Sequence, residues 1–254
     1  MPHILHIPLQ AERPPPRNVY RALHANLLRW IAAVDPALAA EIHDRPVRKA
    51  FTVSALAPAP ASAGWQWRVT LLDDTLLSAV VDVARVQAWL DLDGTAVPVC
   101  WAEAEVASPT YRDLLESSGS DTYLRMAFVS PTTFRAGQLD SPLPEPGAVF
   151  HSWLSHWNDF SPPNLHMSTT LLDLVRERIA IAEIRDLRTE RHDLGRSSPV
   201  GFVGQVTYAI THARLLNQAD VWRLNALAQY AEFCGTGRKT TQGMGQTRRL
   251  DGRY

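Results

Sequence analysis

The chain has 254 residues, of which 46% are hydrophobic and 20% charged, and its formal net charge is −1. This is the composition of a globular protein, and it excludes a disordered tail or a protein coated all over with positive charge. No apolar run approaches the roughly 20 residues needed to cross a bilayer, and the start MPHILHIPLQ has no secretory signal pattern, so we expect a cytoplasmic protein.

The first half of the chain predicts six elements in the order strand, helix, strand, strand, helix, strand. Apolar residues recur at helical spacing from Asn18 until Asp35-Pro36, whereas they alternate from Trp65 to Leu71 as in a half-buried strand. Asp93-Gly94 then turns the chain into the last strand. The predicted elements span 3–10, 18–34, 51–56, 65–72, 76–90 and 96–106.

The second half predicts the same order again. Its elements span 121–130, 147–157, 178–187, 200–210 and 217–233, with a short strand near the end. Gly235 stands where the last helix needs a left-handed residue at its C-terminus. Because this order is that of a ferredoxin-like fold, we expect an α+β protein of two tandem ferredoxin-like (RRM-like, βαββαβ) domains, 1–110 and 120–254, joined by the polar stretch 107–120.

The segment GTGRKTTQGMGQTRRL, residues 235–250, combines four glycines with Arg238, Lys239, Arg248 and Arg249. A Walker A phosphate loop is excluded because Arg238 separates the preceding glycine from the lysine. A dinucleotide-binding unit is excluded because too few residues follow the glycines. Two interpretations remain open: the segment binds a nucleic-acid backbone, or it is a glycine-rich turn whose charges are solvated.

Four segments resemble the CRISPR repeat-processing endoribonucleases of the RAMP superfamily. They are EIHDRPVRKAFTVS (41–54), FVSPTTFR (128–135), GFVGQVTYAI (201–210) and LAQYAEFCGTGRKTTQGMGQ (227–246). The resemblance implies tandem ferredoxin-like folds, cleavage of precursor CRISPR RNA within each repeat, and chemistry that needs no metal and no other cofactor. A non-catalytic RNA-binding subunit of the same superfamily, which would belong to a CRISPR effector complex, is the alternative.

RNA can be cut without a metal because its own 2′-hydroxyl can attack the phosphorus, which leaves a 2′,3′-cyclic phosphate and a 5′-hydroxyl. The protein then has to align that oxygen, move a proton and stabilise charge. His43 matches the place of the family's catalytic histidine, and histidine is the natural proton carrier near neutral pH. Lys49 matches a family position that often carries a catalytic lysine. The alternative for His43 is a surface histidine that caps a short helix, PALAAEIHD.

Some relatives complete this site with a tyrosine on the first helix. The position that corresponds here is Leu28. Tyr20 lies two turns and His24 one turn earlier on the same side, so either is a candidate substitute. The alternative is that both residues only border the apolar stripe of the helix.

Affinity for the RNA is expected from cations and glycines, mainly in the segment 235–250. The candidate RNA-binding residues are Gly235, Gly237, Arg238, Lys239, Thr240, Gly243, Gly245, Arg248 and Arg249, together with Arg45 and Arg48 beside His43. The expected partner is CRISPR repeat RNA, with other effector-complex proteins as further candidates and no membrane. Both a monomer and a homodimer remain open.

Overall fold

The computed structural model describes residues 1–11, 19–44, 48–59, 64–84, 86–195 and 197–250. The chain forms two compact units. The first comprises Met1–Ser108, Leu194–Arg196 and Thr241–Gly243, and the second comprises Pro109–Asp193, Ser197–Thr240 and Met244–Tyr254. The short piece Thr241–Gly243, from the glycine-rich segment near the end of the chain, therefore groups with the first unit.

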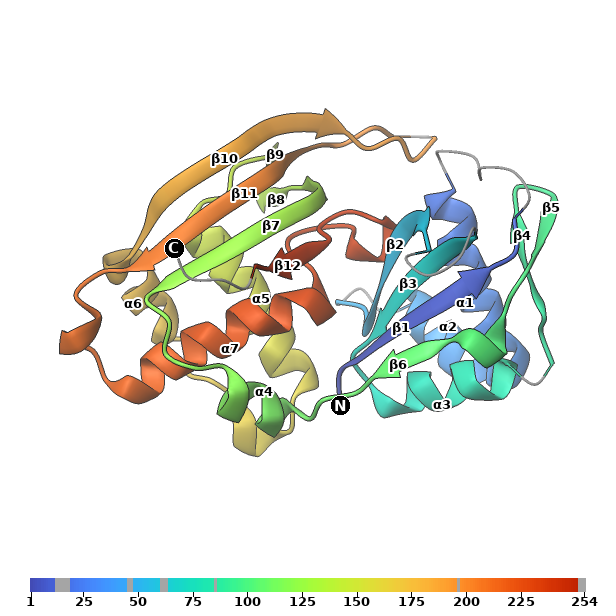
Figure 1. The fold of residues 1–254 in the computed structure, drawn as a ribbon, viewed down its shortest axis with the longest axis horizontal. Helices are drawn as coiled ribbons and strands as arrows, with labels where there is room; N and C mark the ends of the chain where they lie inside the picture. The colour runs from blue at the N-terminus through green and yellow to red at the C-terminus, as the bar shows by residue number, and fades with distance from the viewer. Residues whose placement is uncertain (12–18, 45–47, 60–63, 85, 196, 251–254) are drawn as a thin grey trace. The chain divides into compact units, whose positions relative to one another are not determined.

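A four-stranded antiparallel sheet with the order β2-β3-β1-β6 forms one layer of the first unit (Figure 1). Its elements are β1 (His3–Leu9), α1 (Tyr20–Val34), α2 (Pro36–Asp44), β2 (Phe51–Pro58), β3 (Trp65–Leu71), α3 (Asp74–Val83), β4 (Trp89–Leu92), β5 (Thr95–Pro98) and β6 (Glu105–Ala107). β1 lies between β3 and β6, and its Ile7 pairs with Trp67 of β3. Alternate residues of these strands therefore point to the same face.

The core of the first unit lies between this sheet and the helices. Leu23 and Leu27, one turn apart on α1, are fully buried, as the helical spacing of apolar residues predicts. Val80 of α3 and Trp67 of β3 belong to the same hydrophobic cluster. The sequence pattern therefore places the helices on one side of the sheet.

The second unit repeats this topology with the strand order β10-β11-β7-β12. Its elements are α4 (Tyr111–Ser117), β7 (Tyr123–Thr132), β8 (Phe134–Ala136), β9 (Leu139–Ser141), α5 (Pro146–Phe160), α6 (Leu171–Arg178), β10 (Ile179–Arg191), β11 (Val200–Ile210), α7 (Gln218–Cys234) and β12 (Thr247–Arg249). In both units the first strand of the motif lies between the third and the fourth. The predicted α+β class with two ferredoxin-like motifs is confirmed.

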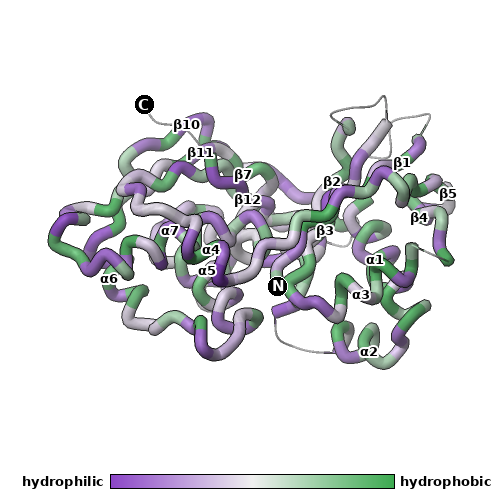
Figure 2. The backbone as a smooth tube through the Cα atoms, turned by 60° about the horizontal axis from the view of Figure 1, so that its bottom comes forward, coloured by the Kyte–Doolittle hydropathy of each residue, from purple (hydrophilic) through white to green (hydrophobic). Residues whose placement is uncertain are grey.

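The two faces of the second sheet differ in polarity. Leu124, Met126 and Phe128 of β7 are buried in the core, whereas the alternate residues Tyr123 and Arg125 point to the other face. Hydrophilic and hydrophobic stretches also alternate along β10 and β11 (Figure 2). The face away from α5 and α7 is therefore the polar one, and we call it the open face.

The predicted extension of the second helix to Leu90 is wrong. α3 ends at Val83, and residues 89–92 form β4, which pairs with β5 through a two-residue turn. Both turn residues, Asp93 and Gly94, have positive φ angles, 53° and 88°, as the tightest hairpin turns require. The predicted strand 96–106 is consequently divided between β5 and β6.

Some elements have no counterpart in the sequence prediction. α4 lies inside the polar stretch 107–120, and α6 and the β8–β9 hairpin were also missed. α4 begins with a capping box in which Thr110 and Asp113 bond each other's backbone amides, a signal that the sequence contains. No helix in the described ranges is both long and apolar enough to cross a membrane.

Candidate functional site

Residues 235–249, which we call the ribbon, lead from the end of α7 into β12 and include it, and backbone hydrogen bonds hold them to the protein. The amide of Thr236 donates to the carbonyl oxygen of Gly245 at 2.8 Å, and the amide of Arg238 donates to that of Thr133 at 3.0 Å. The amide of Gly237 donates to the hydroxyl of Ser152 at 2.9 Å. These amides are used within the second unit, so they do not form the phosphate cradle that glycine amides can provide.

The glycines of the ribbon allow this close packing. Gly237 and Gly245 have φ angles of 79° and 69°, and a Cβ atom at either position would overlap a backbone carbonyl oxygen, of Thr133 and Thr236 respectively. Gly235 follows α7 with a φ of 67°, positive as predicted, although its ψ of −171° lies outside the left-handed helical region. The glycines thus serve the shape of the ribbon.

The sequence resemblance did not reveal which residues hold the ribbon. Pro131 and Thr133, from the segment FVSPTTFR, accept hydrogen bonds from ribbon amides, and the hydroxyl of Ser130 accepts one from Gln246 at 2.9 Å. On α5, the indole of Trp153 donates to the hydroxyl of Thr236 at 2.8 Å. FVSPTTFR and the glycine-rich segment lie far apart in the sequence, and the fold brings them together through these hydrogen bonds.

The first cations of the ribbon lie beside an acidic side chain. Arg238 forms an ion pair with Asp140 of β9, and Arg135 of β8 approaches the same carboxylate at 3.4 Å. The adjacent Lys239 has a φ of 59°, which a residue other than glycine seldom adopts and which carries backbone strain. Thr240 is buried in the short turn that follows.

The two arginines of β12 point to opposite faces of the second sheet. Arg248 pairs with Ala127 on the open face and is exposed, whereas Arg249 pairs with Met126 on the helix side. The side chain of Arg249 is only 13% exposed, and its guanidinium bonds Asp121 at 2.9 Å and the side-chain oxygen of Asn225 at 2.7 Å. These intramolecular bonds favour a structural role for Arg249.

The piece Thr241–Gly243 contacts α1 within the first unit. Nδ1 of His24 lies 2.8 Å from the carbonyl oxygen of Thr241. Because a carbonyl oxygen only accepts, Nδ1 carries the hydrogen, and a neutral ring then keeps its lone pair on Nε2. Gly243 leaves room for Tyr20, since a Cβ atom at that position would overlap the tyrosine ring. Both candidate substitutes on α1 therefore contact the end of the chain.

The candidate catalytic segment, which contains His43, Arg48 and Lys49, begins in the last turn of α2 and precedes β2. His43 belongs to the last turn of α2, although its side chain lies outside the described part, as does the whole of Arg45. The ammonium group of Lys49 donates to the carbonyl oxygen of Ile42, the residue before His43, and Arg48 is exposed. A cation at the C-terminal carbonyls of a helix is stabilised by the helix dipole.

His24 also lies beside the start of β2. The centroid of its ring lies 5.6 Å from that of Phe51, which is fully buried. Since Phe51 follows Lys49 by two residues, the structure brings one side of α1 close to the candidate catalytic segment. No group of three or more His, Cys, Asp or Glu side chains suited to a metal ion occurs among the residues that the structure describes.

Comparison with known proteins gives one family match. Residues 126–247 match the model of the CRISPR-associated endoribonuclease Cas6 family, a range that includes most of the ribbon. None of the curated protein sequences compared with the chain matches it.

Solved Cas6 structures extend the likeness over nearly the whole chain. A Cas6 product complex has a TM-score of 0.84 at 25% identity, covering 98% of this chain and 100% of its own. A Thermus thermophilus Cas6 has a TM-score of 0.76 at 25% identity, with 98% of each chain covered. A Cas6-related protein from Pyrococcus furiosus, at 13% identity and a TM-score of 0.65 over 100% and 99% of the chains, shares the fold alone. The chain is thus similar to the Cas6 endoribonucleases in fold over nearly its whole length and in sequence pattern over residues 126–247.

Proposed function

We propose that this protein is a cytoplasmic endoribonuclease that cleaves precursor CRISPR RNA within its repeats, without a metal, to release mature guide RNAs. The observation that carries the proposal is the likeness to a Cas6 product complex over 98% of the chain, at 25% identity and a TM-score of 0.84. The family match over residues 126–247 supports it independently.

His43 is the proposed proton carrier for attack by the 2′-hydroxyl on the adjacent phosphorus. A positioned acid or base contributes about a hundredfold to ten-thousandfold to the rate. Lys49 is the proposed source of positive charge for the pentavalent phosphorus, because its ammonium group reaches the backbone of the residue before His43. The reaction transfers the hydroxyl proton to a base and returns a proton to the departing 5′-oxygen, so atoms and charge balance without a cofactor.

His24 is the stronger of the two candidates on α1 for completing the site. Its hydrogen bond to Thr241 fixes the ring with Nδ1 protonated, which leaves Nε2 as the atom that can accept a proton. Tyr20 packs against Gly243, where a Cβ atom would overlap its ring. We therefore propose His24 as the partner of His43 and Tyr20 as a packing residue.

RNA affinity is proposed to come from side chains and not from the amides of the ribbon. Arg238, Lys239 and Arg248 can release counterions from the RNA backbone, whereas Arg249 is bonded within the second unit. Arg48 is exposed beside the candidate catalytic segment and is a further proposed phosphate contact. Arg45 lies outside the described residues, and its predicted RNA contact stays a proposal from the sequence.

The proposal is tested by incubating the protein with end-labelled CRISPR repeat RNA in excess EDTA and mapping the product ends. We expect one cut per repeat, with a 2′,3′-cyclic phosphate on one product and a 5′-hydroxyl on the other. Cleavage that returns only with magnesium would contradict metal-independent chemistry. Tight RNA binding with no cleavage under any condition would instead assign the protein to the non-catalytic RNA-binding subunits of the superfamily.

A further inference from the structure

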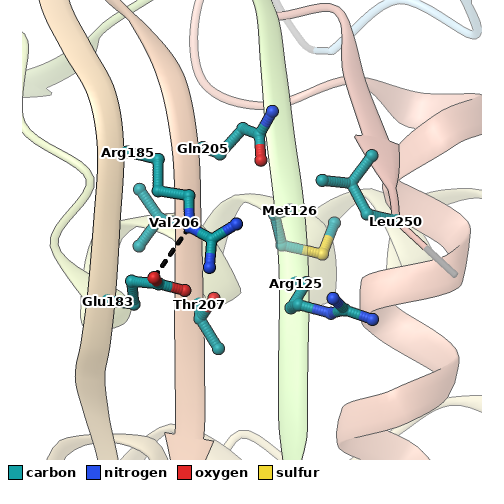
Figure 3. A pocket seen from close by; sticks show the side chains of 8 residues that line it. All are labelled: Arg125, Met126, Glu183, Arg185, Gln205, Val206, Thr207 and Leu250. Carbon is teal, nitrogen blue, oxygen red and sulfur yellow. Dashed lines mark hydrogen bonds and ion pairs between the residues drawn. The ribbon is translucent and has the colours of Figure 1, made fainter. Parts of the chain in front are cut away.

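A shallow hollow lies on the open face of the second sheet, outside the ribbon turn and the candidate catalytic segment (Figure 3). Its empty space, part of it open to solvent, is about 280 Å³. Because part of this space is open to solvent, the hollow would receive a group that lies on the sheet and would not enclose a ligand. The residues that line it are Arg125, Met126, Glu183, Arg185, Gln205, Val206, Thr207 and Leu250.

Strand register explains why polar groups gather there. Thr207 of β11 lies between Arg125 of β7 and Glu183 of β10, and Gln205 pairs with Arg185 in the next row of the same face. Directly opposite residues on adjacent strands point to the same side of a sheet. Three strands therefore bring the polar side chains to one patch, as the close-up shows (Figure 3).

A β-bulge shapes the edge of the hollow. The register between β10 and β11 shifts between Arg185 and Arg188, and Asp186 within this shift has a φ of 52°. Gly204 faces the bulge with a φ of 135°, where a Cβ atom would lie 2.8 Å from the carbonyl oxygen of Asp186. Bulges of this kind re-aim neighbouring side chains, here Arg185 and Gln205.

The chemistry of the hollow fits a nucleobase better than a bare phosphate. Glu183 forms an ion pair with Arg185 at 2.7 Å, so an acceptor with negative charge lies inside the patch and would repel an anion. Arginine, glutamine, threonine and glutamate together offer both donors and acceptors, which is what the edge of a base requires.

Two neighbours on the same face complete such a site. Tyr123 precedes Arg125 by two residues on β7, so it points to the same face, and it is 57% exposed. An exposed aromatic ring on a sheet is a platform on which an RNA base stacks. Arg248 pairs with Ala127 in the row of Gln205 and is exposed, so it can meet a phosphate next to the bound base.

We infer that the open face of the second sheet binds an unpaired ribonucleotide of the RNA strand, with the base in the hollow and against Tyr123. The inference rests on the proposed RNA-binding function and adds to it a site away from the cleaved bond. The sequence lacks the aromatic RNP signature of an RNA-recognition motif, which predicts a poor stacking platform on this face, so the inference relies on Tyr123 for stacking.

Short fluorescein-labelled homopolymers of adenine, cytosine, guanine and uracil ribonucleotides provide the probe, with fluorescence anisotropy as the measurement. Tyr123→Ala should weaken binding of the preferred homopolymer by about fivefold to a hundredfold, the range that loss of one stacked base produces. Trp222→Ala is the matched control, because this tryptophan is a 49% exposed aromatic residue on α7. Arg185→Ala should weaken binding as well, whereas Arg176→Ala, which also removes an exposed arginine from an ion pair, should not.

Equal binding by Tyr123→Ala, Arg185→Ala and the unchanged protein would overturn the inference, as would the absence of binding to all four homopolymers. Displacement of the homopolymer by adenosine monophosphate at equal nucleotide concentration would assign the hollow to free nucleotides and would also overturn it. Cross-linking of a 4-thiouridine homopolymer to the unchanged protein needs no substitution, and its label should fall on the peptide that contains Tyr123. Failure of the proposed cleavage would appear separately, as a protein that binds these probes but leaves repeat RNA intact.

Discussion

The two units share one strand order but elaborate different connections. In the first unit, the connection from α1 to β2 contains α2 and the candidate catalytic residues His43 and Lys49, whereas the matching connection in the second unit contains a short 3-10 turn, Pro163–Leu165, and α6. In the second unit, the connection from α7 to β12 is the ribbon, whereas the matching connection in the first unit holds the β4–β5 hairpin. The proposed functions thus lie in connections on a repeated scaffold, with the proposed cleavage in one unit and the proposed RNA contacts of the ribbon in the other.

The largest effect is expected in the first unit. His43→Ala should reduce the rate of repeat cleavage by about a hundredfold to ten-thousandfold, because a positioned proton carrier is lost. The dissociation constant for the same RNA should change by no more than about twofold, which is the size of effect expected from an ordinary surface substitution. Single-turnover cleavage would measure the rate, and filter binding would measure the dissociation constant. His151→Ala, at an exposed histidine of α5, is the matched control. Normal cleavage by His43→Ala would direct attention to His24.

In the second unit, the largest effect should come from the shape of the ribbon. Gly245→Ala should lower the free energy of unfolding by about 2 kcal/mol or more, because the new Cβ atom overlaps the Thr236 carbonyl and the φ angle is strained. Gly119→Ala separates the atomic overlap from the strained φ angle. Gly119 also has a positive φ, 72°, but nothing lies within 4 Å of the added Cβ atom. Urea titration would measure both. Equal losses for the two variants would mean that strain alone, and not packing, governs the ribbon.

The adjacent arginines of β12 should separate stability from RNA binding. Arg249→Ala should lower the free energy of unfolding by about 2 kcal/mol, because it leaves Asp121 and Asn225 without a charged donor. Arg248→Ala should leave stability within about 0.5 kcal/mol and reduce the salt dependence of RNA binding by about one unit of slope. Urea titrations and salt titrations of RNA affinity would measure these changes. If Arg248→Ala lowered stability and Arg249→Ala lowered the salt dependence, Arg248 and not Arg249 would face the helices.

These arginines also show how far the sequence could go. Period-two alternation implies that Arg248 and Arg249 point to opposite faces, but only the pairing of β12 with β7 decides which one faces the helices. The order of elements was predictable because each strand and helix has its own apolar period. The β4–β5 hairpin was missed because a short apolar run does not distinguish a strand from a helix.

The candidate site was predictable as residue types and not as contacts. Helical spacing places Tyr20 and His24 on one side of α1, yet nothing local indicates that their neighbours are Gly243 and Thr241, more than two hundred positions later in the chain. The glycines suggested a phosphate cradle because their flexibility is visible in the sequence, while the acceptors of their amides are not. Resemblance to a family supplied His43 and Lys49, which composition and spacing alone did not single out.

A smaller effect is expected at the first cations of the ribbon. Replacing both Arg238 and Lys239 by alanine should weaken RNA binding by about tenfold and lower the salt slope by about two units, because two phosphate contacts are lost. Asp140→Asn should act in the opposite direction, up to about threefold, because Arg238 and Arg135 would no longer be paired with a carboxylate. Salt titrations of RNA affinity would measure both variants. Weaker binding by Asp140→Asn would show that the β8–β9 hairpin holds Arg238 in its binding position.

The smallest effect concerns acid stability of the first unit. His3 is fully buried, with Nε2 2.9 Å from Asp74 and Nδ1 2.8 Å from the hydroxyl of Ser108. Burial lowers the pKa of His3 below its ordinary value of 6.5, and the hydrogen bond to Asp74 offsets part of this effect. The folded protein thus binds the proton less readily than the unfolded chain, so its stability is complete above the ordinary pKa and declines as the pH falls below it.

Urea titrations on either side of that pKa would detect this decline, and His3→Gln, which keeps two hydrogen-bonding groups but does not titrate, should remove it. An unchanged decline in His3→Gln would place the acid-sensitive group elsewhere. Because the proposed repeat cleavage would also depend on a histidine, the comparison has to be made on unfolding and not on activity. Measured on unfolding, the comparison separates the structural histidine His3 from the proposed catalytic histidine His43.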